Sequence, residues 1–463
     1  MQKLFKELST LDQRCYEHFC LSEDILMEHA ADGMADYIHQ HYSDHERIII
    51  VCGSGNNGAD GIALARLLHQ DYEVSLYLPL GAKSKMAKLQ YKRAQAIGVI
   101  ECKKIEACDI LVDALFGSGL SRPLDTKSQK LLQKMNQLTA IKIACDIPSG
   151  LQLDGLVQPE SFRADITLSM GALKLGMFSD SAKDIVGDIT VINLGVSRNI
   201  YESESDWTLL DASDLTPPYR HQHNTHKGSY GHLSVVCGEK EGAAILSGRA
   251  AIRYGTGLVT LISKEKRQLP YELMQSSLLP TTTTAIALGM GLGETFSEKS
   301  LQPLLDNNLA LLIDADLFKH PLLLTLLKRD NIILTPHPKE FVSLLRLCQI
   351  ADITVETLQN NRFDYVELFG ERYPNVTLLL KGANVIITQG KHFYINPHGT
   401  NRLAKGGSGD VLSGIIGALL AQGIPPLQAA IQGSLAHTTA ASNFTKNSYS
   451  LVPQDLIEAL TTL

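Results

Sequence analysis

The sequence predicts an α/β fold divided between two domains. Short apolar, strand-like runs alternate with helical patterns along the whole chain, and most of these runs end in a glycine or polar cluster. The length of 463 residues is also more than one hydrophobic core comfortably serves. Because strands that alternate with helices pair in parallel and are covered on both faces, the first half is expected to be a three-layer αβα sandwich.

The strands expected in the first half are separated mostly by helical segments. They are Ile48–Val51, Val74–Leu78, Asp109–Asp113, Ile141–Asp146, Asp165–Met170 and Ile189–Asn193. The acidic stretch Glu202–Pro218 then interrupts the alternation, and it ends in Pro217-Pro218. This interruption places the boundary near Asp211 and predicts domains 1–210 and 211–463.

The second half starts the alternation again and closes with long helices. Its expected strands are His232–Cys237, Leu258–Ile262, Ala285–Leu288, Leu309–Asp314, Ile332–Thr335, Val376–Lys381 and Val385–Thr388, and its helices include Ala243–Tyr254, Ser408–Ala421 and Leu427–Ser442. The motifs of the two halves differ, so an internal duplication is not expected.

Composition excludes several classes of protein. A formal charge of -7 without a basic block argues against nucleic-acid binding. The apolar runs are far shorter than a membrane span, and the first residues lack the apolar stretch of a secretion signal. The eight cysteines show no paired spacing. These features favour a cytoplasmic protein and do not favour zinc; Cys52, Cys145 and Cys237 are expected to be buried thiols.

The most informative segment is the glycine-rich turn Gly53–Gly61 between a strand and a helix. Glycines allow a ligand to approach the backbone, and a helix start offers free N–H groups to a phosphate. Asn56, Asn57 and Asp60 add groups suited to ribose hydroxyls, a cation or chemistry. A tight turn with solvated polar residues is the structural alternative, but the dense spacing favours a ligand site.

Two further strand ends of the first half carry polar clusters, Asp113–Arg122 and Asp146–Gly150. Ligands of open parallel sheets bind beyond the carboxyl ends of strands, so the three clusters are expected to converge. Two carboxylates there could hold a cation or act as acid and base. Alternatively, Asp113 and Asp146 each cap a following helix.

The strongest signal of the second half is Lys405-Gly406-Gly407-Ser408-Gly409-Asp410 before an apolar helix. Successive N–H groups at a helix start form an anion hole, and Asp410 is placed to take a proton from a hydroxyl beside a phosphate. The alternative is a helix cap with flexible glycines. Other strand-end turns are Gly289–Gly293, Asp314-Ala315-Asp316, Thr335–Glu340 and Lys381–Val385.

The first-half motifs GSGNNGADG, DALFGSGL and DIPSG, together with Leu26–Ala30, resemble the epimerase domain of the NAD(P)H-hydrate repair enzymes. The resemblance implies a Rossmann-like domain in which Asp146 is the acid/base. Ala59 replaces the family's usual glycine, and its methyl either crowds the backbone or is tolerated if φ is negative. The resemblance implies hydrate contacts at Asn56, Asn57, Gly58, Ala59, Asp60, Gly117, Ser118, Gly119, Leu120, Ser121, Arg122, Pro123 and Asp146, and a potassium ion held by Asn57, Asp113 and Ser149.

The second-half motifs HKGSYG, GMGLG, DAD, TPHPKE, KGANV and KGGSGD occur in the order of the same family's ribokinase-like dehydratase domain. Lys339 and the Asn401–Ala404 segment differ from the residues that the family usually has at these positions. The resemblance implies hydrate contacts at Ala243, Gly291, His337 and Asp410, with Asp410 as catalytic base, and ADP or AMP contacts at Lys381, Gly382, Ala383, Asn384, Val385 and Gly409.

The implied activity is repair of hydrated NADH and NADPH by epimerisation and by dehydration of the S epimer. ADP or ATP would be the co-substrate, potassium a cofactor, magnesium a further candidate, and a homo-oligomer the expected assembly. Two other interpretations remain open: a ribokinase-like small-molecule kinase, whose N-terminal domain binds a nucleotide without catalysis, and an N-terminal half that only binds a protein partner. A stable phosphorylated product would favour the kinase.

Overall fold

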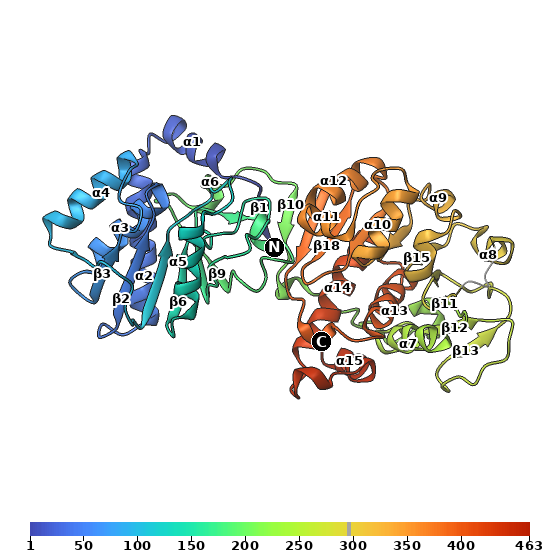
Figure 1. Cartoon of the computed structure of the whole chain (residues 1–463). Coiled ribbons are helices and arrows are strands. Elements are labelled where there is room, and N and C mark those ends of the chain that lie inside the picture. The colour runs from blue at the N-terminus through green and yellow to red at the C-terminus, as the bar shows by residue number, and fades with distance from the viewer. Residues whose placement is uncertain (294–297) are drawn as a thin grey trace. The chain divides into compact units, whose positions relative to one another are not determined.

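The computed structural model describes residues 1–293 and 298–463. Contacts divide the chain into two compact units, an N-terminal unit of Lys3–Ser205 and a C-terminal unit of Asp206–Leu463 together with Met1–Gln2 (Figure 1). Each unit carries an α/β arrangement with its own hydrophobic core. The predicted α/β fold class is therefore confirmed.

The N-terminal unit contains a seven-stranded sheet in the order β4-β3-β2-β5-β6-β7-β9, and every neighbouring pair is parallel. Strand β1 pairs in parallel with β8, and Leu4 lies opposite Leu173. The elements are β1 (Gln2–Phe5), α1 (Ser9–His18), α2 (Glu23–His41), β2 (Arg47–Cys52), α3 (Asn56–Leu68), β3 (Glu73–Tyr77), α4 (Lys85–Ala96), β4 (Ile100–Glu101), β5 (Ile110–Ala114), α5 (Thr126–Gln137), β6 (Ile141–Cys145), β7 (Ile166–Met170), β8 (Leu173–Lys174), β9 (Asp188–Ile192) and α6 (Arg198–Tyr201).

Alternation along the strands explains why helices cover both faces of this sheet. In β2, Ile48 and Ile50 belong to the core that includes residues of α2 and α3. Ile49 and Val51 point to the opposite face, where they share a core with Leu132 of α5. Both faces are apolar because successive strand side chains alternate, and this gives the expected three layers.

The C-terminal unit contains a longer, mixed sheet. Its order is β13-β12-β11-β14-β15-β16-β17-β18-β19-β10, parallel except where β18 runs antiparallel to β17 and β19. The elements are β10 (Trp207–Leu209), β11 (His232–Val236), α7 (Glu241–Arg253), β12 (Leu258–Ile262), β13 (Met274–Ser276), β14 (Ala285–Leu288), α8 (Glu298–Leu305), β15 (Ala310–Ile313), α9 (Leu323–Leu326), β16 (Ile332–Leu334), α10 (Pro338–Leu347), α11 (Val355–Asn360), α12 (Arg362–Arg372), β17 (Thr377–Leu380), β18 (Val385–Gln389), β19 (His392–Asn396), α13 (Ser408–Ala421), α14 (Pro426–Ser442) and α15 (Pro453–Ala459).

Helices α7, α13 and α14 share one apolar core with the sheet of the C-terminal unit. Helix α12 covers the opposite face, where a methyl group built on Gly370 would lie 3.4 Å from Thr388 Oγ1 of β18. Helix α13 is buried along almost its whole length and packs closely on α7. This central position fixes the glycine-rich segment that precedes α13, so the fold presents that segment on a rigid support.

Most predicted elements occur in the structure, with ends that differ by one or two residues. Among the unpredicted strands, β19 completes an antiparallel hairpin with β18 through Gly390, which has a φ of +62°. Its sequence, His-Phe-Tyr-Ile-Asn, alternates only weakly, and the two strand residues of β4 carry almost no pattern at all. Short strands of this kind are set by pairing with neighbours, which local periodicity does not reveal.

Candidate active sites

In the N-terminal unit, the glycine-rich turn after β2 leads directly into α3, and Gly55 is the residue before the first helical turn. A methyl group built on Gly53 would lie 1.8 Å from the carbonyl oxygen of Leu115, and one on Gly58 would lie 2.0 Å from that of Gly53. Gly61 is equally closed in by Ala114. Only Gly55 of these four glycines faces open space, so the others serve packing of the chain on itself and not approach of a ligand.

Ala59 lies inside α3 and is fully buried. Its methyl group joins a small cluster with Met27, Met86 and Ala87. Because Ala59 is helical, its φ is negative and the methyl group causes no backbone strain. The structure thus favours the second of the two alternatives that the sequence left open for this position.

The three strand-end clusters of the N-terminal unit surround one cavity of about 720 Å³. Gly58, Ala59 and Pro123 do not line it, whereas the other hydrate-contact candidates do: Asn56, Asn57, Asp60, Gly117, Ser118, Gly119, Leu120, Ser121, Arg122 and Asp146. Convergence at the carboxyl ends of parallel strands is what places these segments together.

Asp113 links two of these strand ends and is fully buried. Its carboxylate accepts hydrogen bonds from the backbone N–H and the hydroxyl of Ser149, at 2.8 and 2.7 Å, and from the N–H of Leu115 at 3.1 Å. Burial raises the pKa of Asp113 to about 6, although the bonds from Ser149 oppose that shift. Asp113 does not cap a helix; α5 is capped by Asp125.

Asp146 also has a partner that the sequence did not suggest. Its Oδ1 lies 2.6 Å from Nζ of Lys174, a lysine with no exposed surface, and accepts the N–H of Met170 at 3.1 Å. Lys174 Nζ also donates to Ser169 Oγ at 2.9 Å. Asp146 has a φ of +70°, which is uncommon for a residue with a side chain. The surrounding contacts therefore hold this carboxylate in one orientation at the cavity wall.

The cavity residues that sequence analysis did not single out include Asp12 and Tyr16 of α1, and Tyr201 of α6. Tyr201 donates a hydrogen bond of 2.8 Å to Asp12. The cavity also holds Asp60, whose pKa is raised well above its usual value by burial, then by the charges of Asp146 and Asp12. The spacing of Asp12 and Tyr16 at i and i+4 places them on one helix face, but α1 contains no motif that marks it as functional.

In the C-terminal unit, α13 begins at Ser408 and Asp410 occupies its first turn. Gly407 is the residue before the helix and has a φ of +90°, which favours glycine. The Asp410 carboxylate is partly exposed and has no hydrogen-bond or ion-pair partner among the described residues. Burial and the nearby charge of Asp314 raise its pKa to about 6, and Lys381 opposes the shift. Such a carboxylate can accept a proton near neutral pH.

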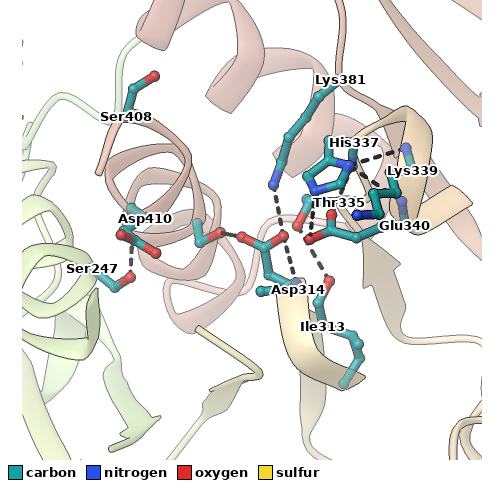
Figure 2. Close-up of polar contacts among 12 residues, drawn as sticks. Ser247, Ile313, Asp314, Thr335, His337, Lys339, Glu340, Lys381, Ser408 and Asp410 are labelled. Atoms are coloured by element: carbon teal, nitrogen blue, oxygen red, sulfur yellow. Dashed lines mark hydrogen bonds and ion pairs between the residues drawn. The ribbon is translucent and has the colours of Figure 1, made fainter. Parts of the chain in front are cut away.

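Helix α7 brings further predicted residues toward the start of α13. Ser247 donates a hydrogen bond of 2.8 Å to the backbone oxygen of Asp410 (Figure 2). Ala243 lies one turn earlier on the same face of α7, and a methyl group built on Gly291 would lie 3.1 Å from its Cβ. The structure therefore places Ala243 and Gly291 in contact, close to the helix end that carries Asp410.

His337 is the N-cap of α10, and its role there is visible in Figure 2. Its Nδ1 accepts the N–H groups of Lys339 and Glu340 at 3.1 and 3.2 Å, and its Nε2 lies 3.1 Å from Glu340 Oε1. Burial and the charge of Lys381 lower the pKa of His337, so its ring is neutral and Nε2 is a hydrogen-bond donor. About half of the side chain remains exposed (47%), so it can also contact a ligand.

The turn between β17 and β18 holds the predicted nucleotide contacts Lys381, Gly382, Ala383, Asn384 and Val385. Gly382 and Ala383 are exposed, whereas Asn384 and Val385 are buried. The Lys381 side chain extends toward α13, since a methyl group built on Gly409 would lie 3.5 Å from Lys381 Nζ. The structure thus brings this turn and the glycine-rich helix start together at one edge of the sheet.

Comparisons with known proteins match both units. A family model described as NAD(P)H-hydrate dehydratase matches residues 233–462, and one described as YjeF-related protein N-terminus matches residues 23–176. The bifunctional NAD(P)H-hydrate repair enzyme Nnr of Helicobacter pylori is 42% identical over 99% of both chains. The chain belongs to the bifunctional NAD(P)H-hydrate repair enzymes. The corresponding enzyme of Escherichia coli is 32% identical and covers 90% of this chain and 84% of its own.

Membership of the NAD(P)H-hydrate repair enzymes makes this chain an enzyme with epimerase and dehydratase domains. Among solved structures, an ADP/ATP-dependent NAD(P)H-hydrate dehydratase from Bacillus subtilis is 26% identical with a TM-score of 0.46, covering 54% of this chain and 94% of its own. No helix within residues 1–293 and 298–463 is long and apolar enough to cross a membrane.

Proposed function

We propose that this repair enzyme restores hydrated NADH and NADPH at two separate sites. Residues 1–210 would interconvert the R and S epimers at ring carbon C6, and residues 211–463 would dehydrate the S epimer with ADP or ATP. The products would be NADH or NADPH, phosphate, and AMP or ADP. The observation that carries the dehydratase assignment is the Asp410 carboxylate, which is partly exposed and unpartnered among described residues at the start of α13.

Dehydration needs a better leaving group than hydroxide, and phosphorylation supplies it. Asp410 would take the proton of the C6 hydroxyl, whose oxygen attacks the terminal phosphoryl group while AMP or ADP departs. The free N–H groups at the start of α13 would stabilise charge on the transferring phosphoryl group. The lone pair of the ring nitrogen would then expel phosphate, and loss of a proton from C5 would restore the double bond.

Ala243, Gly291 and His337 are the remaining candidates for contact with the hydrate. Their positions support this, because Ala243 and Gly291 meet beside the end of α13 that carries Asp410. About half of the His337 side chain is exposed, which leaves its ring accessible to the hydrate. Gly382, Ala383, Asn384, Val385 and Gly409 would contact the adenine nucleotide together with Lys381.

At the N-terminal site, Asp146 would act as acid and base on the hydrate held in the 720 Å³ cavity. Its ion pair with Lys174 keeps the carboxylate oriented. The positive charge of Lys174 would also stabilise the negative charge of Asp146 when this carboxyl gives up its proton. The remaining polar cavity residues would bind the nucleotide portion. Residues of the cavity wall, including Asp60 and Arg122, belong to this set.

Asn57, Asp113 and Ser149 would hold a potassium ion. The set offers only oxygen ligands, which suits a hard cation, and Asp113 and Ser149 are already in contact and buried. Asn57 Nδ2 is buried without a hydrogen-bond partner, so its amide is free to orient the oxygen toward a ligand. A bound cation would supply positive charge near the nucleotide phosphates; magnesium is a further candidate, accompanying ADP or ATP.

The eight cysteines of the chain are all free. This favours a reducing compartment such as the cytoplasm, which is also where NADH and NADPH would be substrates for repair. The expected homo-oligomer stays part of this proposal.

The deciding experiment incubates hydrated NADH with the protein and either ADP or ATP, and follows the recovery of dihydronicotinamide absorbance. We expect recovery that requires a donor, with stoichiometric release of phosphate and of AMP or ADP. A stable phosphorylated product without recovered NADH would instead identify a small-molecule kinase and contradict the proposal.

A further inference from the structure

Asp314 of the Asp-Ala-Asp motif is the centre of a buried polar network to which neither proposed reaction has yet assigned a role. It follows β15, and its side chain is almost fully buried (4% exposed). Its Oδ1 lies 2.7 Å from Lys381 Nζ and accepts the N–H of Ala315 at 2.9 Å. Its Oδ2 accepts the hydroxyl of Ser413 at 2.7 Å. Figure 2 shows Asp314 between Lys381 and helix α13.

Lys381 is fixed at both ends. Its backbone N–H donates to the oxygen of Pro336 at 2.9 Å, and its backbone oxygen accepts from Arg362 at 3.1 Å. Its ammonium is bound by Asp314 and reaches the start of α13, where a methyl group on Gly409 would lie 3.5 Å away. A lysine side chain has four rotatable bonds, so without Asp314 its ammonium would sample many positions.

The ammonium retains capacity for a ligand. A lysine has three N–H donors, and among the described residues one of them is used by Asp314. The remaining two lie beside the backbone amides of the helix start, which themselves favour an anion. The Lys381 ammonium and the free backbone amides therefore meet at the start of α13, beside Asp410. They do not meet at Gly382 and Ala383, the exposed residues farther along the turn.

We propose that Asp314 is a positioning residue that holds the Lys381 ammonium against the terminal phosphoryl group of bound ADP or ATP. Lys381 would neutralise the phosphoryl group as it passes to the C6 oxygen, and it would not contact the adenine end of the nucleotide. Ser413 fixes the second oxygen of Asp314 and ties the network to α13. This inference rests on the proposed nucleotide-dependent dehydration.

The test compares the affinities for ADP and AMP, because AMP lacks the phosphoryl group that Lys381 would contact. Calorimetric titrations use the full-length protein and the variants Asp314→Asn, Lys381→Met, the double variant and Ser413→Ala. Asp352→Asn is the matched control, since it removes an aspartate from an exposed ion pair with Arg346. Thermal unfolding checks that each variant is folded.

We expect Asp314→Asn to weaken ADP binding about tenfold, the worth of one charge-assisted hydrogen bond, and to leave AMP binding within about twofold. Ser413→Ala, which keeps the ion pair, should shift the ratio of ADP to AMP affinity by less than about threefold. The control should change neither affinity. The double variant should bind ADP no more weakly than Lys381→Met, because Asp314 acts only through the lysine. In Lys381→Met the Asp314 carboxylate is left without its partner, and its negative charge would repel ADP.

Equal losses for ADP and AMP, or losses that multiply in the double variant, would overturn the inference while leaving the dehydratase intact. The double variant lacks both the Asp314 carboxylate and the Lys381 ammonium. If its ratio of ADP to AMP affinity equals that of the wild type, the inference also fails. A wild-type protein that bound neither nucleotide would instead refute the proposed function, and this inference with it.

Discussion

At the scale of single residues, function depends on carboxylates that differ in their partners. Asp113, Asp146 and Asp314 are each fixed by hydrogen bonds or by a lysine, whereas the Asp410 carboxylate has no such partner among the described residues. Asp113 and Asp314 organise their neighbours, and the ion pair with Lys174 holds Asp146 in one orientation. An unpartnered carboxylate in partial burial, such as that of Asp410, is suited to exchange a proton. The sequence placed Asp113, Asp146 and Asp410 at strand ends or helix starts, but it could not reveal Lys174 as a partner, because that contact joins residues 28 positions apart through the fold.

Replacing Asp410 with asparagine removes the base but preserves the shape of the side chain. We expect the variant to fold and to lose about 10²–10⁴-fold in the rate of dehydration, the usual contribution of a general base. The measurement is recovery of dihydronicotinamide absorbance from hydrated NADH with ADP. Unfolding temperature and ADP affinity serve as controls and should change little. Turnover near that of the wild type would remove Asp410 from the mechanism.

The pH dependence of dehydration follows from the same carboxylate. Its pKa is raised to about 6 by burial and by Asp314, and only the ionised form can take a proton. We therefore expect kcat/KM to be constant above this pH and to fall about tenfold per unit below it. Enzyme held at low pH and assayed at pH 8 controls for denaturation. An acidic limb near pH 4 would show that Asp410 is not the titrating base.

At the scale of the element, α3 and α13 each present a helix start to a candidate ligand site. Each begins directly after a glycine and points its first turn at a predicted ligand site. The glycine patterns made both helix starts predictable. The sequence could not separate glycines that face a ligand from glycines that face the chain, because Gly53, Gly58 and Gly61 are required by close packing against other strands and loops.

Ala59 of α3 allows a direct test of the residue that departs from the family's usual glycine. We expect Ala59→Gly to lower the free energy of unfolding by about 1 kcal/mol, because glycine is a poor helix former and the buried methyl is lost. It should not increase the rate of epimer exchange. Urea unfolding and epimer exchange measure the two effects. A more active variant would indicate that the methyl group obstructs the site.

Gly407 and Gly406, which precede α13, form a matched pair. Gly407 has a φ of +90°, and an added methyl group would lie 2.6 Å from Pro453, whereas one on Gly406 meets nothing within 4 Å. We expect Gly407→Ala to destabilise the protein by about 1 kcal/mol or more, from the strained backbone conformation and the clash. Gly406→Ala should be nearly neutral in stability. Denaturant unfolding compares the two; equal effects would contradict the geometry assigned to this segment.

At the scale of the whole molecule, the two units have separate cores and separate candidate sites. The alternation of strands and helices was enough to predict the α/β class, and six ordered motifs were enough to suggest the family. The short strands β4, β10 and β13 were not predictable, since each contains three residues or fewer and is defined by its neighbours in the sheet.

Separate sites predict separable activities within one full-length chain. An Asp146→Ala variant supplied with a mixture of R and S hydrates should rapidly restore only the S fraction, and the R fraction should follow at the spontaneous rate of epimerisation. Asp410→Asn should interconvert the epimers, yet restore almost none. Chiral separation of the hydrates, together with dihydronicotinamide absorbance, measures both. If Asp146→Ala consumed the R hydrate as fast as the wild type, Asp146 would not be the acid/base group of the epimerase. If Asp410→Asn also stopped exchange, the two activities would depend on a shared residue, and the division of labour between the units would be wrong.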